Sequence, residues 1–521
     1  MSGEINKSVG ELLEERSKAS PKKPFLFAQS DGRQWTYSEF DRVVNRTANM
    51  LRSRGISKGD VVSLLLPNSP EYIIAYFACW KIGAIAGPVN SLLKPDEIEW
   101  VVENSEAKLL LVGSDWIAGI PACMSAKQEN DVQRYIVVDQ IDTVVEDFDD
   151  ELDPVEIAKD DEAIIIYTSG TTGKPKGCLL THGNLIANAQ QITEWMGFGP
   201  EDRLLTVMPL FHMNAVSVTT MTALFAGGST VVAPKFSASR FWEIIEKYRI
   251  TSFGSVATML SMLLSGQWSV VSGQPKNPKS KIQNPKSELL RFAMCGSAPV
   301  PAEVLKGFEE TFGVLVIEGY GLSESTCRST FNPPSEQRRP GSCGKPIGNE
   351  MKIFDDNDNE VATGELGEIV LRGPNIFKGY FKNDEATKIA FANGWFHTGD
   401  IGYCDDDGFF YIADRKSDMI IRGGENIYPR EIDDLLYTHP AVAAAAVIGV
   451  RDELYGEEVA AFIVLKTGET VTEIEIIEFC KQHLADYKCP KTVYFVDDIP
   501  KGPTGKLLKR VLANRLADAG S

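Results

Sequence analysis

Short apolar runs alternate with longer amphipathic stretches along the first part of the chain. The runs at residues 61–66, 109–112 and 135–138 have the length and the aliphatic content of buried strands. Residues 37–54 instead repeat their apolar positions at the spacing of a helix. Strands that alternate with helices in this way predict an α/β fold, with mainly parallel sheets in a large, multi-layered amino-terminal domain.

A different order of elements follows Asp414. The pattern predicts a strand at 419–421, a Gly-Gly turn, a helix after Pro429, strands at 443–450 and 459–465, a helix from Thr472, and a last short strand and helix. That order is typical of a small α+β domain. Because 521 residues also exceed what one hydrophobic core organises, we expect one domain at residues 1–413 and a carboxy-terminal domain at 414–521.

The charge balance is strongly acidic. The chain has 53 lysines and arginines against 72 aspartates and glutamates, a formal net charge of −19 at pH 7. This balance argues against a general binder of nucleic acid or anionic membrane, so local basic loops must attract any anionic substrate. The amino terminus has no basic region followed by an apolar core, and no apolar run reaches the length of a membrane span. We therefore expect a cytoplasmic protein.

The densest candidate chemistry lies in residues 168–177, directly after an apolar run at 163–167. This stretch contains three glycines, four hydroxyl side chains and two lysines. Glycines let consecutive backbone N–H groups turn toward one anion, hydroxyls add short donors, and lysines supply positive charge. It is not a Walker A motif, because the residue five after Gly170 is Pro175 and no Ser or Thr follows Lys174. A flexible surface loop is the alternative interpretation.

The loop resembles the phosphate loop of the adenylate-forming superfamily, which includes acyl-CoA synthetases, luciferases and the adenylation domains of peptide synthetases. Further blocks match the family in the same order: Gly-Tyr-Gly-Leu-Ser-Glu (319–324), Trp-Phe-His-Thr-Gly-Asp (395–400), Asp-Arg-Lys-Ser-Asp (414–418) with Gly-Gly-Glu-Asn (423–426), and Pro-Thr-Gly-Lys (503–506). The resemblance covers essentially the whole chain and is most like a carboxylate–CoA ligase. It implies that the carboxy-terminal domain is a small, mobile α+β lid with a hinge at Asp414.

This resemblance implies a reaction in two steps. A carboxylic acid is joined to the α-phosphate of ATP as acyl-AMP, with release of pyrophosphate, and the acyl group then passes to the thiol of CoA. Because one anion attacks a polyanion, the site must neutralise phosphate charge and align the carboxylate. The implied ligands are therefore a small-molecule carboxylic acid, ATP, Mg²⁺ and CoA.

The resemblance also implies catalytic and metal-binding roles. Lys506 would bridge the carboxylate and the α-phosphate as charge develops. Glu324 would bind Mg²⁺, a cation that prefers oxygen ligands, with Thr168 as a further ligand. His212 would gate or orient the carboxylate; a packed core histidine is the alternative, and no acid–base role is assigned to it.

Nucleotide and thiol sites are implied in the same way. Asp400 would accept both ribose hydroxyls, with Arg415 as a further donor. Tyr320 would stack on adenine, although core packing is its alternative role. The residues implied to bind the phosphates are Thr168, Ser169, Gly170, Thr171, Thr172, Gly173, Lys174 and Lys176, of which either lysine could instead be solvated. Those implied to surround the nucleotide are Gly296, Ser297, Ala298, Gly319, Tyr320, Gly321 and Ser323, and those facing the thiol channel are Gly423, Gly424 and Glu425.

The identity of the acid and of the acyl acceptor is less constrained. Residues 207–218 and 253–260, the expected acyl-pocket segments, are apolar and contain no lysine or arginine, which favours a monocarboxylic aliphatic or aromatic acid. The nearest rival function is a ligase that loads the phosphopantetheine of a carrier protein, although no carrier domain follows Lys506. A luciferase-like oxygenase and a non-catalytic nucleotide-binding relative are further alternatives. A homodimer is also left open.

Overall fold

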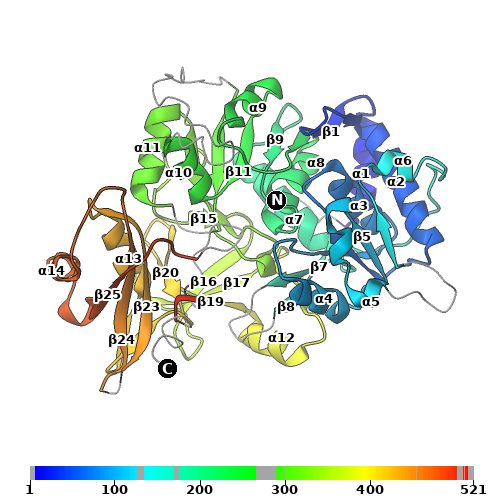
Figure 1. The fold of residues 1–521 in the computed structure, drawn as a ribbon. Helices are drawn as coiled ribbons and strands as arrows, with labels where there is room; N and C mark the ends of the chain where they lie inside the picture. Colours follow the sequence, from blue (N-terminus) through cyan, green and yellow to red (C-terminus); the bar gives the residue numbers. More distant parts are fainter. Residues whose placement is uncertain are drawn as a thin grey trace.

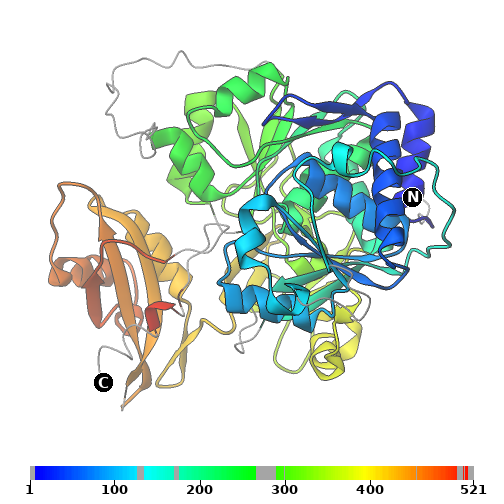
Figure 2. The ribbon, with the colours of Figure 1, turned by 45° about the vertical axis from the view of Figure 1, so that its right-hand side comes forward.

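The computed structural model describes residues 6–125, 134–168, 175–265, 289–297, 300–452, 454–500, 509 and 511–513. These residues form a large body and a smaller one beside it, drawn in orange and red (Figures 1 and 2). The main hydrophobic core of the large body has members from Val9 to Phe410, whereas a separate core in the small body has members from Ile420 to Val493. The predicted α/β class with a second α+β unit is confirmed.

One seven-stranded sheet supplies the strands on either side of the predicted phosphate loop. Its order is β18-β8-β7-β4-β3-β5-β6, with bounds Gly379–Tyr380, Lys176–Thr181, Glu162–Thr168, Ile85–Pro88, Val61–Leu65, Leu109–Val112 and Tyr135–Val137. The pairs from β7 to β6 are parallel, and β8 turns back antiparallel to β7. Strands β3 and β5 are buried throughout, as helix-covered parallel strands require. The three apolar runs predicted as strands are confirmed to within one residue.

A second seven-stranded sheet packs behind the expected acyl-pocket segments. Its order is β13-β12-β11-β9-β10-β1-β2, with bounds Leu315–Glu318, Phe292–Cys295, Ser252–Ser255, Arg203–Thr206, Ser229–Val232, Pro24–Ala28 and Gln34–Thr36. Every pair is parallel except the β1–β2 hairpin. The carboxyl ends of β9, β11, β12 and β13 therefore meet at one edge, where ligands bind in open α/β sheets.

Helix α3 (Pro70–Lys81) contacts both sheets and is buried along its whole length. Its aromatic side chains hydrogen-bond on both sides: Trp80 Nε1 donates to Ala163 O at 2.9 Å, and Tyr76 OH donates to Leu210 O at 2.8 Å. Large rings can fill an interior in this way without leaving a polar tip unpaired. The helix thereby fixes how far apart the two sheets lie.

The remaining helices of the large body cover the sheets. Helix α2 (Tyr37–Ser53) confirms the predicted helix at 37–54 and begins at a capping box, in which Glu39 N donates to Thr36 Oγ1 at 3.2 Å and Thr36 N donates to Glu39 Oε2 at 2.8 Å. The others that the structure describes are α1 (Val9–Ala19), α4 (Pro95–Asn104), α5 (Ala122–Ser125), α6 (Ile141–Val144), α7 (His182–Met196), α8 (Thr222–Ala226), α9 (Phe241–Lys247), α10 (Ala257–Ser265), α11 (Ala302–Phe312) and α12 (Asp384–Ala390). Across the described ranges, none of the helices combines the length and apolar character needed to cross a bilayer.

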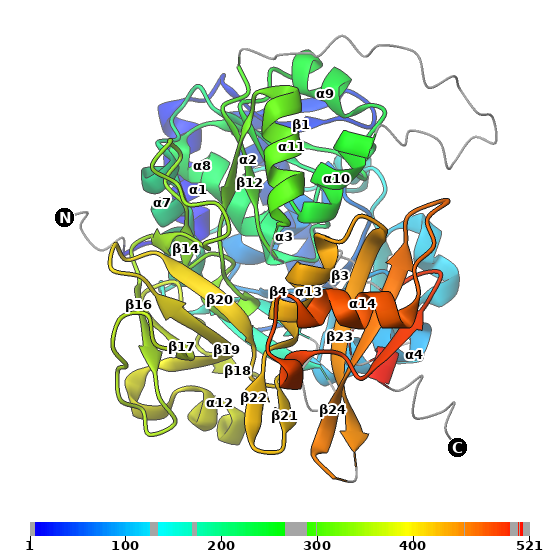
Figure 3. The ribbon, with the colours of Figure 1, turned by 90° about the vertical axis from the view of Figure 1, so that its left-hand side faces the viewer.

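An antiparallel four-stranded sheet leads from the large body to the small one (Figure 3). It consists of β16 (Glu350–Phe354), β17 (Gly367–Arg372), β19 (Phe396–Cys404) and β20 (Phe410–Arg415). The sequence pattern did not predict it, because register shifts in its pairings interrupt the two-residue alternation of a half-buried strand. The sheet places Asp400 directly opposite Arg415.

The small body has the predicted order of elements. They are β21 (Ile420–Arg422), β22 (Glu425–Ile427), α13 (Pro429–Tyr437), β23 (Val442–Asp452), β24 (Gly456–Leu465), α14 (Glu473–Lys481) and β25 (Thr492–Phe495). Its sheet has the order β22-β21-β24-β23, and β25 pairs in parallel with β24. Of the predicted last helix, the structure describes residues 509 and 511–513 as helical.

A buried lysine ties three amino-terminal helices together. Lys81, at the end of α3, has a side chain that is 3% exposed, and its Nζ lies 2.6 Å from Asp41 Oδ1 and 2.7 Å from Asn45 Oδ1 on α2. Glu14 Oε1 on α1 lies 3.4 Å away. We predict that Asp41→Ala lowers the free energy of unfolding by about 2 kcal/mol, because the buried ammonium loses a charged partner. Urea-induced unfolding followed by tryptophan fluorescence measures this change.

The matched control is Glu350→Ala, which removes the partner of Arg372 from an exposed ion pair. Exposed pairs contribute little, so this variant should unfold at nearly the same urea concentration as the parent protein. Equal losses in the two variants would contradict the role of Lys81.

Candidate active site

The β7–β8 hairpin carries the predicted phosphate loop at the carboxyl end of a parallel strand. Thr168 and Lys176 face each other in its register and close the loop. The residues Ser169, Gly170, Thr171, Thr172, Gly173 and Lys174 lie outside the described residues, as do Ala298 and Lys506. Lys176 Nζ lies 5.1 Å from the centroid of the Tyr380 ring, a cation–π contact. The roles of the loop residues stay predictions.

Asp400 joins residues from three separate motifs. Arg415 Nε lies 3.2 Å from Asp400 Oδ1, and Tyr320 OH donates to Asp400 Oδ2 at 2.6 Å. Only 4% of Asp400 is exposed, and a buried carboxylate needs partners of this kind. Burial, together with the Asp400 carboxylate, raises the pKa of Tyr320 well above its ordinary value, which keeps the phenol protonated as a donor. The structure thus brings these three predicted residues into direct contact.

Glu324 lies in a short 3₁₀-helix, Ser323–Ser325, that packs against β8. Its carboxylate is buried and accepts a hydrogen bond from Tyr380 OH at 3.1 Å. Burial raises the pKa of this carboxyl group, so a cation nearby would favour its ionised form. The carboxylate oxygens of Glu324 and the hydroxyl of Thr168 are ligand types that Mg²⁺ prefers, and the site therefore fits the expected metal.

Tyr380 is a site residue that sequence reasoning missed. It belongs to no recognised motif and lies 56 residues from Glu324 along the chain. It reaches the site because β18 pairs with β8, which places Tyr380 opposite Cys178. No local spacing signals such a contact.

Glycine is required where residues 319–321 cross the segment that follows them. A Cβ on Gly319 would lie 2.4 Å from Phe331 Cδ1, and one on Gly321 would lie 2.0 Å from Cys327 O. Any other side chain would overlap these atoms. Ser297, on the neighbouring segment, has a φ of 72°, which a non-glycine residue adopts only when its surroundings hold it. These predicted nucleotide-binding residues therefore lie in tightly packed backbone.

His212 follows β9 and is partly buried beside Phe211, with 4.7 Å between the ring centroids. Within the described part of the chain, its Nε2 has no hydrogen-bond partner. Burial lowers the pKa of the imidazole to about 4, so the ring is neutral at pH 7. A neutral ring can orient a ligand through its unpaired nitrogen, but it carries no imidazolium proton to donate.

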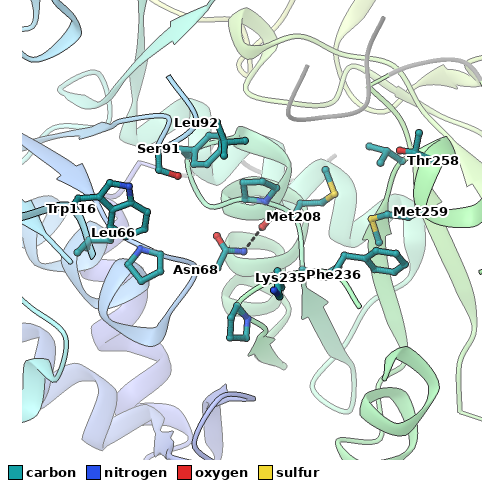
Figure 4. A pocket seen from close by; sticks show the side chains of 16 residues that line it. Leu66, Asn68, Ser91, Leu92, Trp116, Met208, Lys235, Phe236, Thr258 and Met259 are labelled. Atoms are coloured by element: carbon teal, nitrogen blue, oxygen red, sulfur yellow. Dashed lines mark hydrogen bonds between the residues drawn. The ribbon is translucent and has the colours of Figure 1, made fainter. Parts of the chain in front are cut away.

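A cavity of about 360 Å³ opens between the two seven-stranded sheets (Figure 4). Both expected acyl-pocket segments line it, through residues such as Met208 and Met259. The opposite wall contains Leu66 and Trp116, which the sequence did not indicate. Asn68 Nδ2 donates to Met208 O at 2.7 Å and so connects the two walls.

Asp414 connects the two bodies. Its Oδ1 accepts a hydrogen bond from Arg415 N at 2.8 Å, and its Oδ2 accepts one from Arg430 N at 2.8 Å, in the first turn of α13. Gly423 and Gly424, with φ of 60° and 92°, form the turn between β21 and β22. Glu425 begins β22 and is exposed.

Comparisons with known proteins place the whole chain beside well-described sequences. Residues 13–381 match the family model described as AMP-binding enzyme, and residues 431–506 match that of the AMP-binding enzyme C-terminal domain. The chain is 36% identical over 493 residues to an oxalate–CoA ligase of Arabidopsis thaliana, covering 93% of this chain and 94% of the relative. It is 35% identical over 512 residues to a crotonobetaine/carnitine–CoA ligase of Escherichia coli, covering 94% and 96%.

Among solved structures, ATP-bound MatB from Rhodopseudomonas palustris aligns with a TM-score of 0.88 at 30% identity, covering 98% of this chain and 100% of that one. The two family matches together span most of the sequence, on both sides of Asp414. The chain therefore belongs to the AMP-binding enzyme family and is an ATP-dependent carboxylate–CoA ligase that forms AMP.

Proposed function

We propose that the contacts around Asp400 and Glu324 form the nucleotide half of the active site, where a carboxylic acid is adenylated before its transfer to CoA. The observation that carries this assignment is the contact of Asp400 with both Tyr320 and Arg415. Tyr320 is the second residue after β13, at the carboxyl edge where open α/β sheets bind ligands.

The ribose and adenine are assigned to the groups around Asp400. Each carboxylate oxygen can accept more than one hydrogen bond, so Asp400 can hold its protein partners and the two ribose hydroxyls together. Arg415 adds a charged donor on the same side. The ring of Tyr320 and the backbone of Gly296 and Ser297 provide the flat walls that adenine requires, and Gly319, Gly321 and Ser323 complete the surround.

The phosphates are assigned to the loop that follows β7. Backbone N–H groups and hydroxyls from Thr168 onward would bind the phosphate oxygens, and Lys174 and Lys176 would supply positive charge. Glu324 and Thr168 would hold Mg²⁺, which when bound supplies charge neutralisation at the phosphate oxygens. Tyr380 keeps the Glu324 carboxylate oriented through its hydrogen bond.

The acid is assigned to the cavity between the sheets. His212 stays neutral and orients the carboxylate toward the α-phosphate. Lys506 then binds the carboxylate and the α-phosphate at once, so that its ammonium stabilises the charge that develops between them. The two relatives are named for acids of different charge, because oxalate is a dianion whereas carnitine carries a quaternary ammonium. Their names therefore do not identify the acid that this enzyme uses.

The second step is assigned to the lid, residues 414–521, which pivots at Asp414. The turn at Gly423 and Gly424, followed by Glu425, would then face the thiol channel, where the missing side chains leave space for a pantetheine arm. Free CoA is the proposed acceptor, and the cytoplasm, where ATP and CoA are both available, is the proposed location. A carrier protein is the alternative acceptor.

The products of the reaction test the proposed function directly. Purified protein with ATP, Mg²⁺, CoA and a panel of carboxylic acids should give an acyl-CoA that appears only with one class of acid, as measured by mass spectrometry. AMP and pyrophosphate should appear in equal amounts with it. Formation of AMP and pyrophosphate without any acyl-CoA would instead favour a carrier protein as the acceptor.

Lys506→Ala should lower the rate of adenylate formation by roughly 100-fold or more, because a donor aimed at developing charge is lost. ATP binding should change little. Single-turnover formation of acyl-AMP measures the first effect, and calorimetric titration with ATP measures the second.

Lys491→Ala is the matched control, because this exposed lysine pairs with Asp452 elsewhere on the lid. It should leave adenylation unchanged. Adenylation at the parent rate in the Lys506 variant would remove the proposed catalytic role.

Asp400→Asn should raise the KM for ATP by roughly 10- to 100-fold, because a charged hydrogen-bond acceptor is lost from the ribose. The parent enzyme should also prefer ATP over 2′,3′-dideoxy-ATP, and the variant should lose most of that preference. Steady-state kinetics with both nucleotides measures this double comparison.

Asp356→Asn is the control for that experiment, because Asp356 is exposed and pairs with Lys416, the neighbour of Arg415. It should retain the preference for the ribose hydroxyls. An unaltered preference in the Asp400 variant would place the ribose elsewhere.

A further inference from the structure

One interior arginine has fewer partners than its charge requires. Arg328 is 1% exposed, and among the described residues its Nε and Nη2 have no hydrogen-bond partner. Its Nη1 donates to Cys327 O at 3.2 Å, and its Cζ lies 5.4 Å from the centroid of the Phe331 ring. A guanidinium stays charged in proteins and carries five N–H donors. Burying it with unused donors is unfavourable unless an anion joins it.

The backbone is held so that this side chain points inward. Thr326 and Cys327, directly before Arg328, have φ of 62° and 134°, a region that β-branched and other non-glycine residues avoid. Two buried amides fix the turn, since Asn188 Nδ2 donates to Arg328 O at 2.7 Å and Asn375 Nδ2 donates to it at 3.1 Å. Backbone strain that neighbours enforce in this way is a feature of functional sites.

The guanidinium packs against a glycine at the carboxyl edge of the second sheet. A Cβ on Gly296 would lie 2.6 Å from Arg328 Nη2, and a Cβ on Gly254 would lie 2.6 Å from Asn214 Oδ1. Gly254 pairs with Met294, two residues before Gly296, so both glycines face the same side of the sheet. Neither of these two glycines can be replaced without displacing a polar side chain.

Asn214 is also a buried polar side chain with unused hydrogen-bonding groups. It is 5% exposed, and neither its Oδ1 nor its Nδ2 has a hydrogen-bond partner among the described residues. It lies two residues after His212, and Gly254 lies two residues before Val256, which lines the cavity. Arg328 thus packs at Gly296, where a Cβ would also lie 2.8 Å from the carbonyl oxygen of Gly319, and Asn214 packs at Gly254, on a strand that leads into the cavity wall.

We propose that Arg328, assisted by Asn214, binds a second negatively charged group of the acid, so that the substrate is a short dianion with a carboxylate or sulfonate near the reacting carboxylate. This inference rests on the proposed function of the same site. The unused donors are buried, and a rotation of the long Arg328 side chain would bring them to an acid in the cavity. The proposal of a dianionic acid differs from the monocarboxylic acid that the composition of residues 207–218 and 253–260 favoured. The difference arises because Arg328 lies outside both segments.

The test compares acids of similar size and different charge. The parent enzyme should form acyl-CoA from malonate, succinate or sulfoacetate with a kcat/KM roughly 100-fold above that for propionate or butyrate, as charged hydrogen bonds of this strength imply. Carnitine should be the poorest substrate, because its ammonium would face the guanidinium. Arg328→Met should lose roughly 100-fold with the dianions and gain with the monocarboxylates.

Two further variants make the test specific. Arg328→Met should fold, because methionine fills similar space and the substitution removes a buried charge that lacks partners. Calorimetric titration with ATP checks this, and the Kd for ATP should be unchanged. Asn214→Leu should show a smaller change in the same direction. Arg372→Met, on the exposed pair with Glu350, should retain the parent preference.

Three outcomes would overturn the proposal. Equal losses with dianions and monocarboxylates in Arg328→Met would make Arg328 structural. Equal kcat/KM for dianions and monocarboxylates in the parent enzyme would show that the enzyme does not recognise a second anionic group, although it would still be a ligase. Formation of acyl-CoA from none of the acids would instead overturn the proposed function, and this inference with it.

Discussion

Charge that is buried must be partnered, and this constraint organises the interior around the active site. Asp400 is held by a tyrosine and an arginine from two other segments, and Glu324 is held by Tyr380. The contact of Tyr320 with Asp400 spans 80 residues of chain and that of Tyr380 with Glu324 spans 56. The two carboxylates therefore join segments that lie far apart in the sequence. The same absence of water that makes an unpaired charge costly also strengthens its interaction with a bound nucleotide. The packing requirement and the binding requirement are therefore met by the same contacts.

The sequence predicted those parts of the molecule that depend on local pattern. Strands β3 and β5 are continuous apolar runs, and α2 repeats its apolar positions at the spacing of a helix. The elements of the small body follow for the same reason. The third sheet was missed because register shifts break its alternation, and short motifs carry no information about which distant segment will pair with them.

The same distinction applies to the site. Residues inside compact motifs, such as Asp400 and Glu324, could be predicted as site residues because the motif itself is the signal. Tyr380 and Arg328 were not, because their importance appears only when a strand pairing or a strained turn places them. Arg328 is the clearer case: it lies four residues after a recognised motif, yet an arginine at an arbitrary position is normally a surface charge. Only its burial and its unused donors distinguish it.

A second negative group on the acid would weaken binding of the acid beside ATP unless a cation of the protein paired with that group. Two unit charges about 6 Å apart repel by about 3 kcal/mol at an effective dielectric constant of about 20, so a dianion near the triphosphate would bind roughly a hundredfold less well than a neutral-ended acid. A guanidinium that contacts the second negative group offsets a repulsion of that size. It would also hold the acid at two points, which aligns the reacting carboxylate with the α-phosphate. In this way the cation that selects the substrate also orients it, and the cost of burying Arg328 is recovered when the acid binds.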